Sequence, residues 1–90
     1  MGLFSRKPKL HSCVFCSEVV VDESVTIWEH YATHLIGVTD NNGNEAFTFE
    51  CPHCGLMDEA WGGGRPDPSS NGVSAMFVHL MQRHGVNLIN

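Results

Sequence analysis

Cys13-Val14-Phe15-Cys16 begins a series of four residue pairs that extends almost to the C-terminus of the chain. Every cysteine belongs to a pair three residues apart, and four of the six histidines belong to pairs four or five residues apart. In chain order the pairs are Cys13 and Cys16, His30 and His34, Cys51 and Cys54, and His79 and His84. Zinc prefers four tetrahedral ligands, and a Cys-x-x-Cys turn with two histidines about one helical turn apart supplies them. The order therefore predicts two zinc ions, bound at two sites that follow each other along the chain.

Other combinations of the four pairs remain open at this stage. A cross-braced arrangement would give one four-cysteine site and one four-histidine site, although a structural zinc site of four histidines is unusual. A single four-cysteine zinc ribbon would leave both histidine pairs unexplained. His11 and His53 lie beside the cysteine pairs and could replace a ligand, but we expect them to be solvated or to lie behind the ligands.

A chain of this length would gain needed stability from bound metal. At 90 residues it forms one compact unit or two small ones, which bury too little apolar surface for generous stability. Residues 1–10 are polar and basic, and no apolar stretch approaches the roughly 20 residues that span a bilayer. We therefore expect an intracellular protein, cytoplasmic or, in a eukaryote, nuclear, whose thiols stay reduced and free to bind metal.

The charge is distributed unevenly along the chain. The formal net charge is −5, and all ten acidic residues lie between Glu18 and Asp67. From Leu10 onward, ten acidic residues face two basic ones, a net charge of −8. The basic residues are Arg6, Lys7 and Lys9 in the N-terminal tail, and Arg65 and Arg83 in the remainder. The acidic part of the chain from Leu10 onward should repel the phosphates of a nucleic acid, because nonspecific nucleic-acid affinity comes from Lys and Arg displacing counterions.

The first half reads as a flexible basic tail (1–9), a hairpin around the first cysteine pair and a helix. We expect the helix over residues 25–36, after the helix-start residues Asp22-Glu23-Ser24 and before Gly37 as a left-handed stop. Asn41-Asn42-Gly43-Asn44 lies between β-prone runs, which predicts a structured hairpin connector over residues 38–48. Phe47 or Phe49 should lie near the seam between the two units.

In the second half, a Gly- and Pro-rich segment follows Cys54. Its composition predicts an inserted loop over residues 55–71. The last helix should begin near Asn71 or Ser74 and end at Gly85, before a C-terminal tail over residues 86–90. The apolar stripe of this helix is Val73, Met76, Phe77, Leu80 and Met81.

Both halves resemble the two-cysteine, two-histidine zinc finger family. The spacings are Cys13-x₂-Cys16-x₁₃-His30-x₃-His34 and Cys51-x₂-Cys54-x₂₄-His79-x₄-His84. The apolar positions Val20, Ile27, Phe49 and Met76 also match the pattern of the family. The resemblance implies a small zinc-stabilised α+β fold of two ββα units, 10–37 and 49–85, joined by the connector. Because His79 and His84 are five residues apart, the last helical turn must loosen for both to reach one metal.

Two catalytic interpretations are disfavoured, and we expect no enzyme. Cys51-Pro52-His53-Cys54 resembles the motif of thioredoxin-like disulfide oxidases, but the glycine-bounded segment after it is too short for the helix that activates their thiol. The pair His30 and His34 has the spacing of zinc metalloproteases without the glutamate that acts as general base.

The positions that read DNA in zinc fingers are unsuited to bases in this chain. They are Glu23, Thr26 and Glu29 in the first half and Gly72, Ala75 and Val78 in the second, with no Arg, Lys, Asn or Gln among them. We therefore expect a non-catalytic module that binds another protein, as an adapter or regulator, with Trp28, Trp61 and Val78 as candidate contacts and a basic surface on the partner. The alternative is a nucleic-acid-binding regulator that uses the basic N-terminal tail.

Overall fold

The computed structural model describes residues 9–86 and Leu88; the predictions for residues 1–8 and for positions 87, 89 and 90 lie outside these described residues. In chain order the elements are β1 (Leu10–Ser12), β2 (Val19–Val21), α1 (Ser24–Ala32), β3 (Ile36–Thr39), β4 (Glu45–Thr48), β5 (Glu50–Cys51), β6 (Gly55–Leu56) and α2 (Pro68–His84). The strands pair as antiparallel hairpins, β1 with β2, β3 with β4 and β5 with β6. The predicted α+β class is confirmed. Neither helix in this part of the chain is long and apolar enough to cross a membrane.

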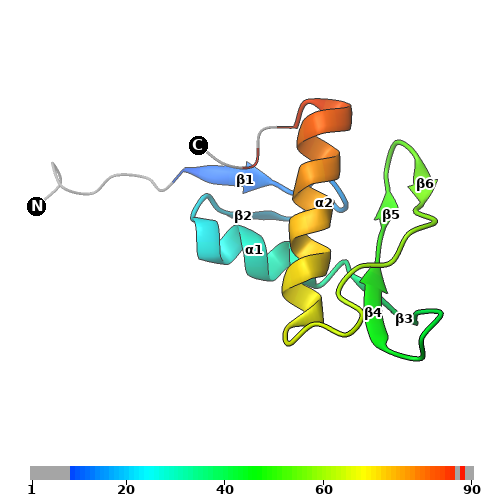
Figure 1. Cartoon of the computed structure of the whole chain (residues 1–90). Coiled ribbons are helices and arrows are strands. Elements are labelled where there is room, and N and C mark those ends of the chain that lie inside the picture. The colour runs from blue at the N-terminus through cyan, green and yellow to red at the C-terminus, as the bar shows by residue number, and fades with distance from the viewer. Residues whose placement is uncertain (1–8, 87, 89–90) are drawn as a thin grey trace, which may run out of the picture.

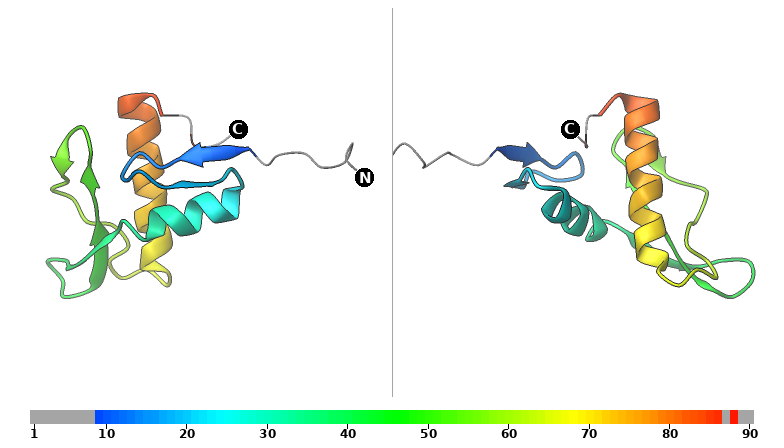
Figure 2. Two further views of the ribbon diagram at one scale, coloured as in Figure 1. Left: turned by 180° about the vertical axis from the view of Figure 1, so that it is seen from behind. Right: turned by 60° about the vertical axis from the view of Figure 1, so that its left-hand side comes forward.

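Helix α2 lies at the centre of the molecule. Figure 1 and the left view of Figure 2 show it between the β1–β2 hairpin with α1 on one side and the strands β3 to β6 on the other. Its apolar stripe is buried as predicted, with Val73, Met76 and Leu80 fully enclosed. Leu88 is also buried and joins the same core, so the chain after α2 returns to it.

One core joins the two halves of the chain. The Tyr31 ring of α1 meets the Phe77 ring of α2 edge to face, with centroids 5.5 Å apart. Phe15, from the first cysteine pair, meets Phe49 in the same way at 6.3 Å. Phe49 therefore lies at the seam, as predicted, and the chain forms one compact unit. Loss of one half must disturb the other, because each supplies aromatic surface that the other buries.

Helix α1 ends earlier than predicted. It stops at Ala32, and the next three backbone N–H groups, of residues 33–35, each donate to a carbonyl three residues back, which tightens the chain into a 3₁₀-type turn. Ile36 and Gly37 then belong to β3, where Gly37 pairs with Phe47. Gly37 is not among the glycines with positive φ, so its prediction as a left-handed stop was wrong. Pairing with β4 outweighs local helix propensity over these residues.

The connector forms the predicted hairpin, β3 with β4. Gly43 has a φ of 82°, a backbone conformation that glycine adopts readily. The Asp40 carboxylate accepts hydrogen bonds from the backbone N–H groups of Asn42, at 2.9 Å, and Asn44, at 2.8 Å. These bonds close the turn in the way expected of an aspartate in a tight loop.

Helix α2 begins earlier than predicted, at Pro68. The Asp67 side chain caps it by accepting from the Ser70 backbone N–H at 3.3 Å, and Pro68 occupies the first helical turn, where its missing N–H costs nothing. The inserted loop is correspondingly shorter. Trp61 also ties this loop to β4, through two backbone hydrogen bonds with Phe47 of 2.9 and 2.8 Å.

Gly72 lets α2 approach the connector closely. A Cβ atom at this position would lie 3.0 Å from Leu35 Cδ2 and 3.1 Å from Phe47 Cβ. We expect Gly72→Val to lower the free energy of unfolding by about 2 kcal/mol, because overpacking outweighs the better helix propensity. Denaturant unfolding of the metal-loaded protein measures this loss. Ser74→Val, at an exposed position of the same helix, is the control, and an equal loss there would rule out overpacking.

Thr48 of β4 carries a buried hydroxyl that lacks a hydrogen-bond partner among the described residues. Replacing it by the similarly shaped valine removes the cost of burying that group. We expect Thr48→Val to raise the free energy of unfolding by about 1 kcal/mol. Thr39→Val, at an exposed position of β3, should change it by much less. A destabilised Thr48→Val protein would show that the hydroxyl makes a stabilising contact.

Candidate metal centres

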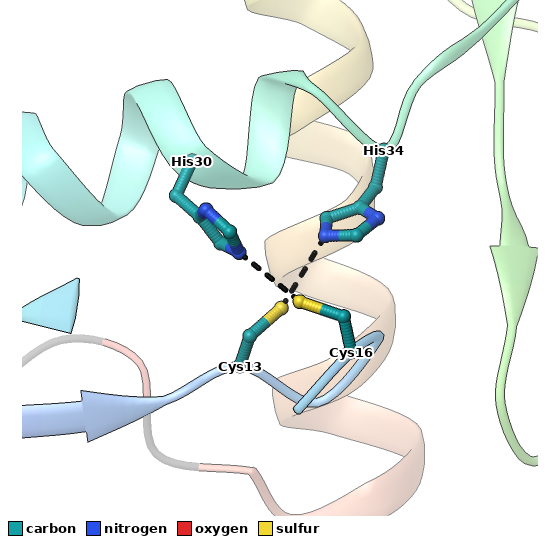
Figure 3. A group of neighbouring side chains, drawn as sticks. All are labelled: Cys13, Cys16, His30 and His34. Atoms are coloured by element: carbon teal, nitrogen blue, oxygen red, sulfur yellow. Dashed lines mark hydrogen bonds between the residues drawn. The ribbon is translucent and has the colours of Figure 1, made fainter. Parts of the chain in front are cut away.

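The first cluster brings together the side chains of the first two pairs. Cys13 and Cys16 come from the turn between β1 and β2, His30 from α1, and His34 from the turn just after it (Figure 3). Their ligand atoms all lie within 4.8 Å of one another. Cys13 Sγ lies 3.5 Å from His34 Nε2, and Cys16 Sγ lies 3.4 Å from His30 Nε2.

The second cluster has the same composition and spans more of the chain. It joins Cys51 and Cys54, from β5 and the turn to β6, with His79 and His84 of α2. His84 Nε2 lies 3.4 Å from Cys51 Sγ, 3.2 Å from Cys54 Sγ and 3.3 Å from His79 Nε2. One imidazole nitrogen carries either one proton or one lone pair, so it cannot form three hydrogen bonds at once. The four atoms are therefore arranged as they would be around a cation.

Both clusters fit a tetrahedral zinc shell in size. Zinc–sulfur bonds of about 2.3 Å and zinc–nitrogen bonds of about 2.0–2.1 Å, at tetrahedral angles, separate sulfur from nitrogen by about 3.6 Å and two nitrogens by about 3.3 Å. The separations of 3.2–3.5 Å in the structure match these values. Each cluster can therefore hold one metal ion, and its sulfur and nitrogen donors are consistent with zinc.

The end of α2 shows how histidines five residues apart reach one point. The backbone N–H of Gly85 donates to the carbonyl of Leu80, five residues earlier rather than the usual four. Gly85 has a φ of 65°, and the Val86 N–H donates to the same carbonyl at 3.1 Å. The last turn is thus wider than a regular α-helical turn, which confirms the predicted loosening.

The two cysteine pairs share a backbone arrangement. The Phe15 N–H donates to Cys13 Sγ at 3.3 Å, and the His53 N–H donates to Cys51 Sγ at 3.4 Å. Such bonds favour the thiolate, which is the form that binds metal. Burial raises the pKa of the Cys13 thiol, while the backbone N–H groups of Phe15 and Cys16 act in the opposite direction. A bound cation would offset the cost of burying the thiolate.

Two of the imidazoles lie in surroundings that favour their neutral form. Burial lowers the pKa of His34 below its ordinary value, and the neighbouring His30 acts in the same direction. Burial likewise lowers the pKa of His79, assisted by His84. A metal ligand must offer a free lone pair, so both shifts favour the binding form.

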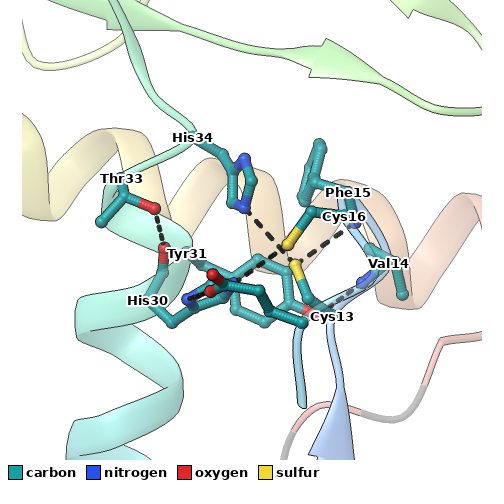
Figure 4. Close-up of polar contacts among 9 residues, drawn as sticks. Cys13, Val14, Phe15, Cys16, His30, Tyr31, Thr33 and His34 are labelled. Atoms are coloured by element: carbon teal, nitrogen blue, oxygen red, sulfur yellow. Dashed lines mark hydrogen bonds and ion pairs between the residues drawn. The ribbon is translucent and has the colours of Figure 1, made fainter. Parts of the chain in front are cut away.

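Tyr31 connects the first cluster to the core. Its hydroxyl oxygen lies 2.7 Å from His11 Nε2. It also accepts from the Val14 backbone N–H at 3.2 Å (Figure 4). Burial raises the pKa of Tyr31 to about 12, so the phenol stays neutral at ordinary pH. The tyrosine thus holds the cysteine turn against α1, which carries His30 and is followed directly by the turn that carries His34. The spacing of the ligand pairs gave no sign of this role, which depends on contacts with His11 and Val14 from another part of the chain.

Glu18 lies behind a ligand of the first cluster. Its carboxylate is 3.6 Å from His30 Nδ1, whereas the other ring nitrogen of His30, Nε2, faces Cys16. A carboxylate in this place orients the imidazole toward the metal position. Because Glu18 is 71% exposed, its effect should be at the low end of the usual range.

We expect Glu18→Gln to weaken metal binding at the first cluster by up to about tenfold while leaving the fold intact. Competition against a chromophoric zinc chelator measures this loss. Glu45→Gln, an exposed change on β4, controls for the lost charge alone. Equal affinities of the two variants would show that Glu18 does not orient His30.

The alternative ligand sets predicted from sequence are not the ones that the fold assembles. Every cysteine and histidine lies in the described part of the chain, and there the donors gather as the two sequential groups. His11 contacts Tyr31, and the His53 ring lies 4.5 Å from the His84 ring, between centroids, outside both groups. Both histidines therefore lie beside the clusters, as expected.

The candidate partner contacts occupy two places. Trp61 stacks on Phe49 with centroids 5.4 Å apart and an interplanar angle of 23°, and it lines a hollow of about 290 Å³ with Val78, which is 46% exposed. Trp28 is half-buried on α1, with its ring edge-to-face against Phe77 at 5.3 Å. Both tryptophans thus contribute to the core and keep part of their surface accessible.

No protein-family model, curated protein or solved structure matches the chain. The resemblance to zinc fingers therefore rests on the two Cys₂His₂ clusters themselves, which are compatible with sites of that kind.

Proposed function

We propose that the chain is a non-catalytic module in which two zinc ions hold a small surface for binding another protein. In this proposal there are two zinc-finger-like ββα units. The first consists of β1, β2 and α1, and the second consists of β5, β6 and α2. The β3–β4 hairpin lies between them in the chain. The observation that carries the proposal is the pair of complete four-donor clusters set in an acidic body.

The donor sets support a structural role for the metal. Two thiolates and two imidazoles in a tetrahedral arrangement are typical of structural zinc. A catalytic zinc site keeps one position for water, whereas four protein donors at each cluster fill the tetrahedral shell. The ions then act as part of the core of a chain too short to be very stable without them.

The charge supports a protein partner over a nucleic acid. Between Leu10 and Gly64 the chain has nine acidic residues and no lysine or arginine. Glu23 and Glu29, two of the positions that would face DNA, are exposed. A surface of this sign favours a partner with a basic surface and repels a phosphate backbone.

Three measurements test the proposal. Metal analysis of the purified protein should find two zinc ions per chain. The immobilised zinc-loaded protein should retain a specific protein from nuclease-treated cell extract, and raised salt should release it. A gel-shift assay at low ionic strength should show no nucleic-acid binding. Tight, salt-sensitive binding of nucleic acid with no retained protein would instead support the alternative function.

A further inference from the structure

The outer side of α1 carries a hollow that no metal cluster uses. Ser24, Val25, Trp28 and Glu29 line it, and its volume is about 300 Å³. These residues are three to five positions apart or adjacent, so they share one side of the helix. Val25 is 67% exposed, so its side chain presents apolar surface at the hollow.

The floor of this hollow is held in place from beneath. Trp28 packs its ring edge-to-face against Phe77 of α2, and Ile27 and Tyr31 on the inner side of α1 are buried in the core. The tryptophan is therefore a fixed surface rather than a side chain that must be ordered on binding. A preformed apolar floor lowers the entropic cost of association.

The rim of the hollow is acidic. Glu29 lines it, and Glu23, the exposed N-cap residue of α1, comes directly before Ser24. None of the four lining residues is basic, and the two residues that precede them in the sequence, Asp22 and Glu23, are acidic as well. An apolar floor beside an exposed carboxylate matches a side chain with an aliphatic stem and a cationic end.

We propose that this hollow binds one arginine side chain of the protein partner. The stem packs on Val25 and the Trp28 ring, and the guanidinium pairs with the Glu29 carboxylate. Arginine fits better than lysine because its planar, weakly hydrated cation both stacks on an aromatic ring and pairs with a carboxylate. The inference rests on the proposed protein-binding function and names the chemistry that the partner presents.

The test is an NMR titration of the zinc-loaded, ¹⁵N-labelled chain with the peptide acetyl-Gly-Arg-Gly-amide. The two tryptophans give two indole N–H signals, and Trp61 serves as the internal reference. The Trp28 signal should shift in a saturable way, while the Trp61 signal should shift much less. Glu29→Gln should weaken binding by about threefold, as expected for an exposed ion pair. Val25→Ser should weaken it by a similar factor through the lost apolar contact.

Both changes are at exposed positions, so the variants should keep the fold, which unchanged metal content and circular dichroism would verify. Glu45→Gln on β4 is the matched control and should bind like the wild type. The proposal is overturned if the Trp28 signal does not move, if a norleucine peptide binds as tightly, or if Glu45→Gln weakens binding as much as Glu29→Gln.

A second readout separates this inference from the proposed function. If the wild-type chain retains a protein partner and the double variant Val25→Ser, Glu29→Gln retains it equally well, the hollow is not the binding site, although the chain still binds protein. If the wild-type chain retains no protein at all, the proposed function itself fails.

Discussion

Replacing Cys13 by serine is expected to reduce the bound metal from two ions per chain to one and to unfold the β1–β2 hairpin with α1. Cys13 is the most buried ligand of its cluster, and its sulfur accepts the Phe15 N–H and faces His34. A serine hydroxyl keeps its proton near neutral pH and is a poor zinc ligand, so the site loses both a donor and a charge. Metal analysis and hydrogen exchange of the α1 amides measure the two effects.

The shared core sets how far this unfolding spreads. Phe77 on α2 loses two aromatic neighbours, Tyr31 and Trp28, when α1 unfolds. We therefore expect the first half to unfold and the second half to be destabilised without losing its metal. Cys54→Ser is the matched control, since it removes a ligand at an exposed position of the other cluster. A Cys13→Ser protein that still bound two metal ions would refute the assignment of this ligand.

The ligand pairs could be predicted from the sequence because their spacing is local chemistry. Local backbone geometry alone brings together the two sulfurs of a Cys-x-x-Cys turn and the two imidazoles of histidines one helical turn apart. The fold places all eight side chains in the predicted groups. The start of α2 could also have been predicted from the sequence, because Asp67-Pro68 is a helix-start signal. The Gly and Pro content of residues 55–71, which predicted a loop over that whole range, concealed this start.

The end of α1 could not be predicted from local sequence in the same way. Residues 33–36 continue a helical pattern, and only the pairing of β3 with β4 turns Ile36 and Gly37 into a strand. That pairing depends on residues ten or so positions further along, which local propensity does not include. The same holds for Glu18 behind His30 and for the packing of Trp28 on Phe77, since both arise from segments that meet only in the folded chain.

Removing both metals with a chelator is expected to unfold the chain. Structural zinc contributes about 10–16 kcal/mol of apparent binding free energy in small domains, which exceeds the roughly 5–15 kcal/mol stability of a typical protein. The metal-free chain should therefore lose its cooperative thermal transition and its dispersed NMR spectrum. Returning two equivalents of zinc should restore both, provided the thiols are kept reduced.

The two ions should leave at different rates, the second cluster first. Cys54 is exposed, whereas the first cluster has one buried ligand and three half-buried ones. A chelator therefore reaches the ion of the second cluster more easily than the ion of the first cluster. Stopped-flow chelation should show two phases of equal amplitude, with α1 amides still protected from hydrogen exchange after the fast phase. Protection lost in the fast phase would mean that the first cluster releases its metal first, or that the shared core cannot survive the loss of either ion.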